Sequence, residues 1–207
     1  MRVYKFLDAH FGMKSLREKR LKISTLNDLN DPFELLPFGM TDKTNRMALN
    51  MARQTWGTDH GMLCFSSDWC DPVIWAHYSD KHRGLCLGFD IPDRYVTKVN
   101  YVFDRLQFPD QPELARAAAW VFTKFANWAY EKEIRLCTTL TDKSDGLYFK
   151  EFGEDLKLAE VIVGARCNLT KNEILEAVRP LNNVKLIKAR PGFRRFEIVE
   201  DQRCFLR

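Results

Sequence analysis

The sequence predicts an α+β fold in a single domain spanning residues 1–207. Strand-like stretches have hairpin-like neighbours and are interrupted by helical stretches, which favours α+β over a regular alternation of strand and helix. A chain of 207 residues that is 45% hydrophobic and 13% aromatic can bury one substantial core and is not disordered. No internal repeat, low-complexity segment or linker interrupts it, so one domain is expected.

The elements of the first half follow from apolar periodicity, helix caps and turn residues. We expect strands at 2–8, 21–25, 61–67 and 85–91, and helices at 15–20, 42–57 and 71–84. The last of these helices has Asp71 as N-cap and Pro72 at its first position, and it ends at Gly84. Residues 26–39, "LNDLNDPFELLPFG", form a turn-rich loop.

The second half contains the longest expected helix, at 112–129, followed directly by a strand at 130–136. Another strand is predicted at 95–103, where the sequence is β-branched and aromatic. Further strands are expected at 157–164, 184–189 and 194–200. A helix at 169–181 begins with a capping-box pattern formed by Thr170 and Glu173.

Charge and hydropathy restrict the partners and the location of the protein. The net charge of +4 comes from 32 basic and 28 acidic residues that are interspersed, which permits an anionic partner without requiring one. The first residues carry no apolar core of signal-peptide length, and no stretch approaches the roughly 18 apolar residues of a spanning helix. We therefore expect a soluble, cytoplasmic protein with no membrane partner.

Residues 130–136, "YEKEIRL", gather charge in apolar surroundings. In a strand alternate residues share a face, so Glu131, Glu133 and Arg135 project together while Ile134 and Leu136 point into the core. One interpretation is the solvated face of an edge strand. The other is a cleft, in which a carboxylate beside a sugar ring stabilises positive charge as a glycosidic bond loosens.

Residues 65–84, "FSSDWCDPVIWAHYSDKHRG", carry a second cluster. Ser66 lies at a strand end, Trp75 and Tyr78 share one helical face, and Arg83 follows. Aromatic residues at this spacing either pack in a core or form a platform for a cofactor, and both interpretations stay open. The His and Cys spacings match no standard zinc pattern, so no metal site is predicted.

Two further motifs have weaker interpretations. Residues 30–34, "NDPFE", are compatible with a capped turn whose Asn and Asp bond their own backbone. The stretch "GFRRFEIVE" near the C-terminus mixes Arg with Phe, as nucleic-acid binders and many sheet edges do.

The ordered set "YKF", "NDPFE", "LCFS", "W-x-x-Y-S-D-x-H-R-G" and "W-x-Y-E-x-E-I-R" resembles an uncharacterised bacterial family, domain of unknown function 2971. This resemblance covers about residues 4–164. More distantly, residues 61–91 and "YEKEIRL" are similar to the strand, helix and late glutamate strand of ADP-ribosyltransferases and poly-ADP-ribose polymerases. Tyr4, Ser66 with Tyr78, and Glu133 follow the order of that superfamily's three-part signature.

This second resemblance implies a split, mixed or antiparallel sheet with flanking helices that binds NAD, as substrate, in a cleft. It gives Glu133 the role of contacting the nicotinamide-side ribose and stabilising an oxocarbenium ion, with Glu131 activating the acceptor. Cofactor binding is assigned to five residues: Tyr4, Ser66, Trp75, Tyr78 and Arg83. Trp75 or Tyr78 stacks on nicotinamide and Arg83 meets the pyrophosphate.

The leading hypothesis is therefore an NAD-using, ADP-ribosyltransferase-like enzyme. It would act as a bacterial toxin or anti-phage defence effector that modifies a protein or nucleic acid or hydrolyses NAD. A non-catalytic module on the same fold, which binds a nucleotide or nucleic acid through Arg83, Arg194 and Arg195, is the alternative. The third hypothesis is a metal-dependent nuclease built on Glu131, Glu133, Asp155 and Lys157.

Overall fold

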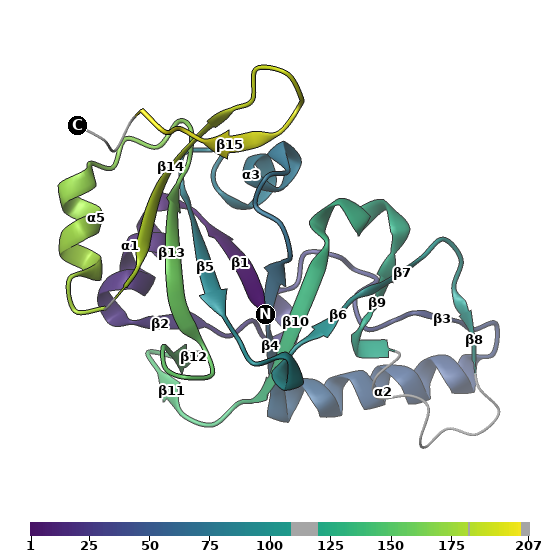
Figure 1. Ribbon diagram of the computed structural model, residues 1–207. Coiled ribbons are helices and arrows are strands. Elements are labelled where there is room, and N and C mark those ends of the chain that lie inside the picture. Colours follow the sequence, from purple (N-terminus) through teal and green to yellow (C-terminus); the bar gives the residue numbers. More distant parts are fainter. Residues whose placement is uncertain (109–119, 182, 204–207) are drawn as a thin grey trace. The chain divides into compact units, whose positions relative to one another are not determined.

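The computed structural model describes residues 1–108, 120–181 and 183–203 (Figure 1). The chain divides into two compact units. Unit 1 comprises Met1–Lys22, Phe65–Tyr95 and Lys150–Arg207, and unit 2 comprises Ile23–Cys64 and Val96–Phe149. The predicted α+β class is confirmed, because a mixed sheet and a few helices occur together. The assignment to a single domain stays a prediction.

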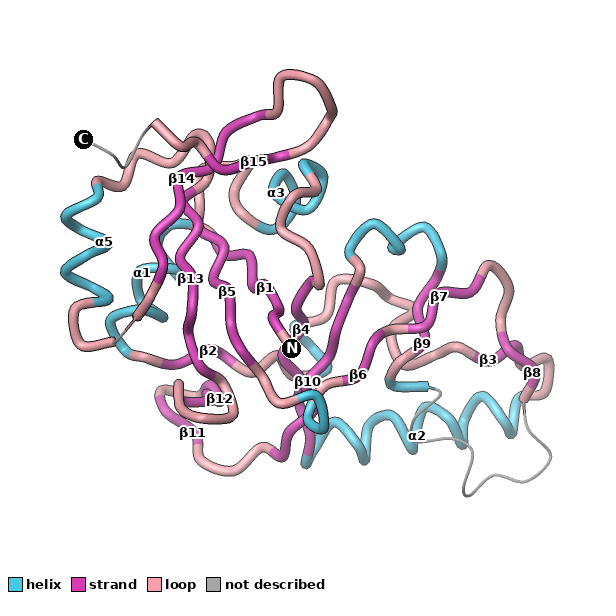
Figure 2. The backbone as a smooth tube through the Cα atoms, in the orientation of Figure 1, coloured by secondary structure: helices cyan, strands magenta, loops and turns pink. Residues whose placement is uncertain are grey.

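Unit 1 is built on the strands β15, β14, β13, β5 and β1, which neighbour one another in that order (Figure 2). β13 and β14 run parallel, whereas the other neighbours among these five are antiparallel. Its main elements are β1 (Arg2–Leu7), α1 (Ala9–Glu18), β2 (Arg20–Lys22), α3 (Pro72–Tyr78), β5 (Leu85–Asp90), the short helix η2 (Asp93–Tyr95), β13 (Lys157–Val163), α5 (Lys171–Val178), β14 (Lys185–Pro191) and β15 (Ile198–Glu200).

Helices pack on the strands of unit 1. Because β5 lies between two other strands and under a helix, its side chains are mostly buried and its sequence is mostly apolar. α1 packs on β1, β5 and α5, and α3 packs on β1 (Figure 1). Gly12 of α1 lies so close to Leu85 that a Cβ at this position would be 2.9 Å from Leu85 Cδ1. On α3, the fully buried Trp75 meets Phe6 edge to face, with ring centroids 5.1 Å apart. β5 is therefore a central strand with the apolar composition of one.

Unit 2 contains shorter strands and the longest helix among the described residues. Its elements are the short helix η1 (Leu26–Asp28), β3 (Phe38–Gly39), α2 (Lys43–Asp59), all but the last two residues of β4 (His60–Ser66), β6 (Thr97–Lys98), β7 (Asn100–Val102), β8 (Leu106–Gln107), β9 (Thr123–Phe125), the short helix η3 (Ala126–Glu131), β10 (Glu133–Thr139), β11 (Lys143–Ser144) and most of β12 (Leu147–Glu151). β10 lies between β4 and β6, while β7 pairs with β9 and β3 with β8, both in parallel. One cluster of buried core residues in this unit consists of Leu35, Phe38, Leu49, Met62, Trp120 and Val121.

Most predicted elements of unit 1 are confirmed, but α1, α3 and β15 differ in their bounds. β15 begins at Ile198 rather than at residue 194, because residues 193–196 form a loop. α1 begins at Ala9 rather than at residue 15, because Asp8 is its N-cap and accepts a hydrogen bond from Phe11 N at 2.8 Å. It ends where Lys19 adopts the left-handed conformation, with φ of 54°. α3 begins at Pro72, as predicted, but ends at Tyr78 instead of Gly84.

The second half of the prediction was less accurate in unit 2. Residues 112–119 of the predicted long helix lie outside the described residues, and its remaining part is not a continuous helix. Thr123–Phe125 is a strand that pairs with β7, and a short 3₁₀ helix follows it. The strand predicted at 95–103 is divided into β6 and β7. Tertiary pairing overrides local propensity in both places.

Candidate functional site

β10 supplies two residues of the candidate site. Glu133 is its first residue, and Arg135 lies on the same face, as the alternation predicted. Arg135 Nε donates to Glu133 Oε1 at 2.8 Å, and Arg135 Nη2 donates to Glu133 Oε2 at 3.0 Å. Glu131 does not belong to this strand, contrary to the prediction. It ends η3, and Lys132 follows in a left-handed conformation with φ of 45°.

All three of these charged residues are buried. Arg135 is 0% exposed, Glu133 5% and Glu131 6%. Ile134 and Leu136, which point to the opposite face of β10, are buried as well. The interpretation of a solvated strand face is therefore wrong. Buried charges of this kind are stable only when they are paired and hydrogen-bonded.

Lys124 of β9 provides the second cation. Its Nζ lies 2.7 Å from Glu131 Oε2, 3.1 Å from Glu133 Oε2 and 3.1 Å from Glu34 Oε1. An ammonium group has three donors, and here it has three carboxylates around it. The pairing of Lys124 with Tyr101 in β7 fixes its backbone, and Nζ also lies 4.9 Å from the centre of the Trp128 ring. Lys124 was not among the predicted site residues, because it falls within the helix predicted at 112–129.

Glu34 is the third carboxylate, and it comes from the motif "NDPFE". The Asp31 side chain accepts from Phe33 N at 2.9 Å, and its carbonyl accepts from Glu34 N at 3.0 Å, so the motif is indeed a capped turn. Leu35, fully buried with φ of 61°, anchors the turn in the core. Arg135 Nη2 donates to both Glu34 oxygens, at 2.9 and 2.8 Å. Two motifs that lie 101 residues apart thus form one ion pair.

We call Glu34, Lys124, Glu131, Glu133 and Arg135 the charged cluster. Burial alone would raise the pKa of Glu133, but the charges and hydrogen bonds of Arg135 and Lys124 outweigh burial and hold that pKa at about 2. Burial would lower the pKa of Lys124 and of Arg135, yet the surrounding carboxylates raise both above their ordinary values. Glu133, Lys124 and Arg135 are therefore all charged at neutral pH.

Backbone contacts complete the charged cluster. The Tyr101 hydroxyl accepts a hydrogen bond from Glu133 N at 2.8 Å, and Arg135 Nη1 donates to the Val121 carbonyl. Burial raises the pKa of Tyr101 to about 12, so this hydroxyl stays protonated. With these protonation states, Glu133 cannot act as a general acid and Lys124 cannot act as a base at neutral pH. What the cluster offers is a fixed, ionised carboxylate that can stabilise positive charge.

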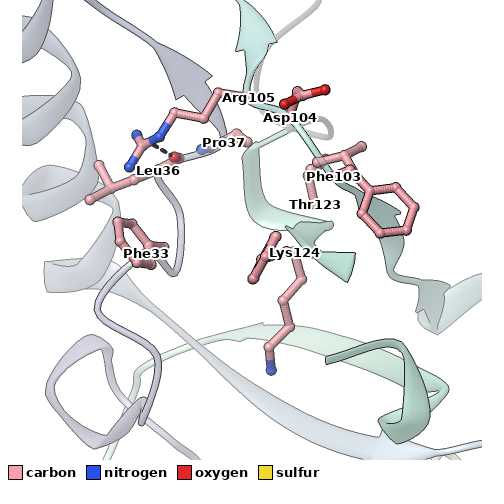
Figure 3. Close-up of a pocket in the computed structure, with 10 residues that line it drawn as sticks. Phe33, Leu36, Pro37, Phe103, Asp104, Arg105, Thr123 and Lys124 are labelled. Atoms are coloured by element: carbon pink, nitrogen blue, oxygen red, sulfur yellow. Dashed lines mark hydrogen bonds between the residues drawn. The ribbon is translucent and has the colours of Figure 1, made fainter. Parts of the chain in front are cut away.

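A pocket of about 260 Å³ opens in the same unit (Figure 3). Its lining includes Phe33, next to Glu34 in the chain, and Lys124. Figure 3 shows the Lys124 side chain extending away from Arg105, so that its amino group lies at the far end from that residue. Arg105 lies over the Phe33 ring, with its guanidinium carbon 5.1 Å from the ring centre, and donates to the Leu36 carbonyl at 3.2 Å. Exposed rings and one guanidinium thus surround a mainly apolar hollow.

The predicted cofactor-binding residues all lie in unit 1. Tyr4 of β1 lies opposite Ser66 at the end of β4 and opposite Gly88 of β5. A Cβ at Gly88 would be 3.2 Å from Tyr4 Cε1, so this glycine leaves room for the tyrosine ring. Burial and, after it, the charge of Glu160 raise the pKa of Tyr4 to about 12. Ser66 Oγ accepts a hydrogen bond from Asp68 N at 3.1 Å.

The other three predicted residues differ in exposure. Trp75 is fully buried, its indole N–H donates to the Trp69 carbonyl at 2.6 Å, and His82 stacks on its ring. It packs in the core and has no ring face open to a nicotinamide. Tyr78 is half-buried, and Arg83 is exposed with its guanidinium 3.6 Å from Asp80. The Tyr78 ring meets the His77 ring edge to face, with the ring centroids 6.1 Å apart.

The turn after α3 has an unusual backbone. Asp80, Lys81 and His82 all have positive φ, at 42°, 54° and 69°. A Cβ at the following Gly84 would lie 2.0 Å from the Leu7 carbonyl oxygen, so only glycine fits there. The motif "S-D-K-H-R-G" therefore encodes a strained turn and a close backbone approach.

Comparison with protein-family models, with curated proteins and with solved structures found no match. Within residues 1–108, 120–181 and 183–203, no group of three or more His, Cys, Asp or Glu side chains is arranged to hold a metal ion. No helix in this described part of the chain is both long enough and apolar enough to cross a membrane.

Proposed function

We propose that this protein is an ADP-ribosyltransferase-like enzyme that uses NAD as a substrate. One observation carries the proposal: Glu133, the glutamate that the resemblance assigns to catalysis, is the first residue of β10 and is paired there with Arg135 and Lys124, which hold its pKa well below its ordinary value. A carboxylate with a low pKa stays negative at neutral pH, which suits the stabilisation of an oxocarbenium ion. The membership of the domain of unknown function 2971 family is part of the same proposal.

The reaction breaks the bond between C1′ of the nicotinamide-side ribose and the ring nitrogen of nicotinamide. The bonding electron pair leaves with nicotinamide, and positive charge develops on C1′ and the ribose ring oxygen. Glu133 stabilises that charge, and water or a nucleophilic group of a macromolecule then forms the new bond to C1′ and loses a proton. Glu131 keeps its proposed role of activating the nucleophile.

A nucleotide-binding module without turnover is the second candidate. The hydrogen bonds of Glu133 favour this second candidate. Oε1 of its carboxylate already accepts from Arg135, and Oε2 accepts from both Arg135 and Lys124. A carboxylate has about four lone-pair sites, so a ribose hydroxyl competes with these cations for the remaining ones. In this role the charged cluster fixes the framework of unit 2 and performs no chemistry.

Nicotinamide release from NAD and transfer of labelled ADP-ribose to protein and nucleic acid test the proposal. We compare the wild type with Glu133→Gln, which keeps the shape of the side chain and removes its charge. Glu34→Gln is the matched control, because it removes the charge of another carboxylate that Arg135 and Lys124 contact. We expect Glu133→Gln to lower turnover at least about a hundredfold, as the loss of a group that stabilises transition-state charge does, and Glu34→Gln to lower it less.

The two candidates give different outcomes. Equal turnover in the wild type and in folded Glu133→Gln refutes catalysis by Glu133. Saturable NAD binding without nicotinamide release supports the binding module instead. A failure of the wild type to bind NAD at millimolar concentration, measured by calorimetry, rejects the NAD-using enzyme and leaves only a module that binds another nucleotide or nucleic acid.

A further inference from the structure

The loop between β14 and β15 exposes two phenylalanine rings to solvent. Phe193 is 88% exposed and Phe196 is 103% exposed, although phenylalanine is normally a core residue. Figure 1 shows this loop extending beyond the ends of both strands within unit 1. Neither ring contributes to the core of the unit, and the proposed NAD chemistry does not use them. Two such rings within one short loop make this loop a candidate interaction surface.

Short-range hydrogen bonds give the loop a defined shape. Gly192 N donates to the Glu197 carbonyl at 2.7 Å, and Glu197 N donates to the Arg195 carbonyl at 2.9 Å. Directly after the loop, Ile198 N donates to the Cys70 carbonyl at 2.7 Å, which ties the start of β15 to the segment before α3. The four residues between these closing contacts, "FRRF", are all exposed. They form a tip that is held at its base.

The charge at this tip is positive. Arg194 and Arg195 separate the two rings, and Arg190 lies over the Phe193 ring with its guanidinium carbon 4.4 Å from the ring centre. The stretch from 193 to 196 contains no carboxylate. The tip therefore combines three guanidinium groups with two exposed aromatic rings. Such rings bind bases by stacking, and such guanidinium groups bind phosphates by charge.

We propose that the tip formed by residues 193–196, together with Arg190, binds single-stranded nucleic acid. Bases stack on Phe193 and Phe196, while Arg190, Arg194 and Arg195 contact the phosphates between them. A lipid surface fits less well. The Arg190 guanidinium lies on the face of the Phe193 ring and would enter the membrane together with that ring, and Arg194 and Arg195 would lie between the two inserted rings, which is costly in an apolar environment. The proposal is independent of whether the protein turns over NAD.

Fluorescence anisotropy with labelled oligothymidylate and oligouridylate across a series of salt concentrations tests the proposal. Two variants separate the two contributions. Phe193→Ala/Phe196→Ala removes stacking, so we expect at least about a tenfold loss of affinity with the salt dependence preserved. Arg194→Ala/Arg195→Ala removes phosphate contacts, so we expect the slope of log affinity against log salt to flatten by about 1.4, or about 0.7 for each arginine.

Control variants keep the result interpretable. Arg194→Lys/Arg195→Lys keeps the charge and should keep the slope. Phe11→Ala/Arg17→Ala removes an exposed ring and an exposed guanidinium from α1 of the same unit, and it should bind like the wild type. Thermal melting confirms that each variant folds, which is expected because the substituted side chains of the tip are exposed.

Three outcomes overturn the proposal. The first is oligonucleotide binding that is equal in the wild type and in both alanine variants, and the second is an absence of binding at low salt. The third is binding of phosphatidylserine vesicles that the alanine variants abolish while oligonucleotide binding is unaffected, which would assign the tip to a membrane surface instead.

Discussion

Replacing Lys124 by methionine should destabilise the protein strongly at neutral pH. Methionine approximates the length of the lysine stem but leaves Glu34, Glu131 and Glu133 around a position with no charge. The Lys124 side chain is 4% exposed and the three carboxylate side chains are 2%, 8% and 4% exposed, so water cannot substitute for the ammonium. Removing one partner of a buried ion pair costs about 3–5 kcal/mol of unfolding free energy. For a chain of this size that is a fall in Tm of about 10 °C.

The loss should depend on pH in a defined direction. Lys124 is one of the groups that hold the pKa of Glu133 at about 2, below its ordinary value of 4.5. A depressed carboxylate pKa contributes stability that is present above the unfolded pKa and is lost as pH falls toward the folded pKa. In Lys124→Met the pKa of Glu133 rises toward its unfolded value, so this contribution shrinks. The difference between variant and wild type is therefore large near pH 7 and narrows as pH falls below about 4.5.

Urea unfolding followed by tryptophan fluorescence measures this difference, since three of the five tryptophans, Trp56, Trp120 and Trp128, lie in unit 2. Lys98→Met is the matched control, because Lys98 is an exposed lysine in β6 of the same unit. It should change the unfolding free energy by less than about 0.5 kcal/mol. A loss below about 1 kcal/mol for Lys124→Met near pH 7, or a gap that widens in acid, would refute the account of the charged cluster.

Three further predictions concern the framework and the thiols. Gly84→Ala places a Cβ 2.0 Å from the Leu7 carbonyl oxygen and should lower Tm sharply or prevent folding, whereas Gly153→Ala, with no atom within 4 Å, should not. Thr170→Ala removes the N-cap of α5 and should lower the free energy of unfolding, measured with urea, by about 1 kcal/mol; an unchanged free energy would show that the Thr170 side chain does not stabilise the helix. Partial burial raises the pKa of the half-buried Cys137 thiol to about 11, so its reaction with a disulfide reagent near pH 7 should be slow in the native protein and fast in urea; equal rates would contradict this raised pKa.

The fold could be predicted from the sequence where local signals agree with tertiary structure. The cap and proline at Asp71 and Pro72 start α3, and the capping box at Thr170 and Glu173 starts α5, as expected. The predicted helix at 112–129 failed at Thr123–Phe125, where the pairing with β7 is decided by a strand more than twenty positions earlier in the chain. Local helical periodicity contains no information about such a partner.

The site was predictable in part for a similar reason. Period-2 alternation correctly placed Glu133 and Arg135 on one face, but it left open whether that face is solvated or lines a cleft. Whether charges on a strand are solvated or paired depends on residues far away in the chain, here Lys124 and Glu34. The turn that presents Glu34 was recognisable, but its sequence carried no signal that the side chain is buried, since Glu173 also precedes an apolar pair and is exposed. Its partner could not be found without the structure.

Unit 1 is assembled from three separate segments of the chain, and this matters during synthesis. When the ribosome has produced residues up to about 149, all of unit 2 has been made, but β13, β14 and β15 have not. β5 then has β1 on one side and an unpaired row of backbone hydrogen-bonding groups on the other. The sequence of β5 is almost entirely apolar, so the nascent chain exposes an aggregation-prone strand edge until the last quarter of the chain emerges. A chain terminated in this interval should aggregate, and the cell benefits from a chaperone that covers β5 until β13 arrives.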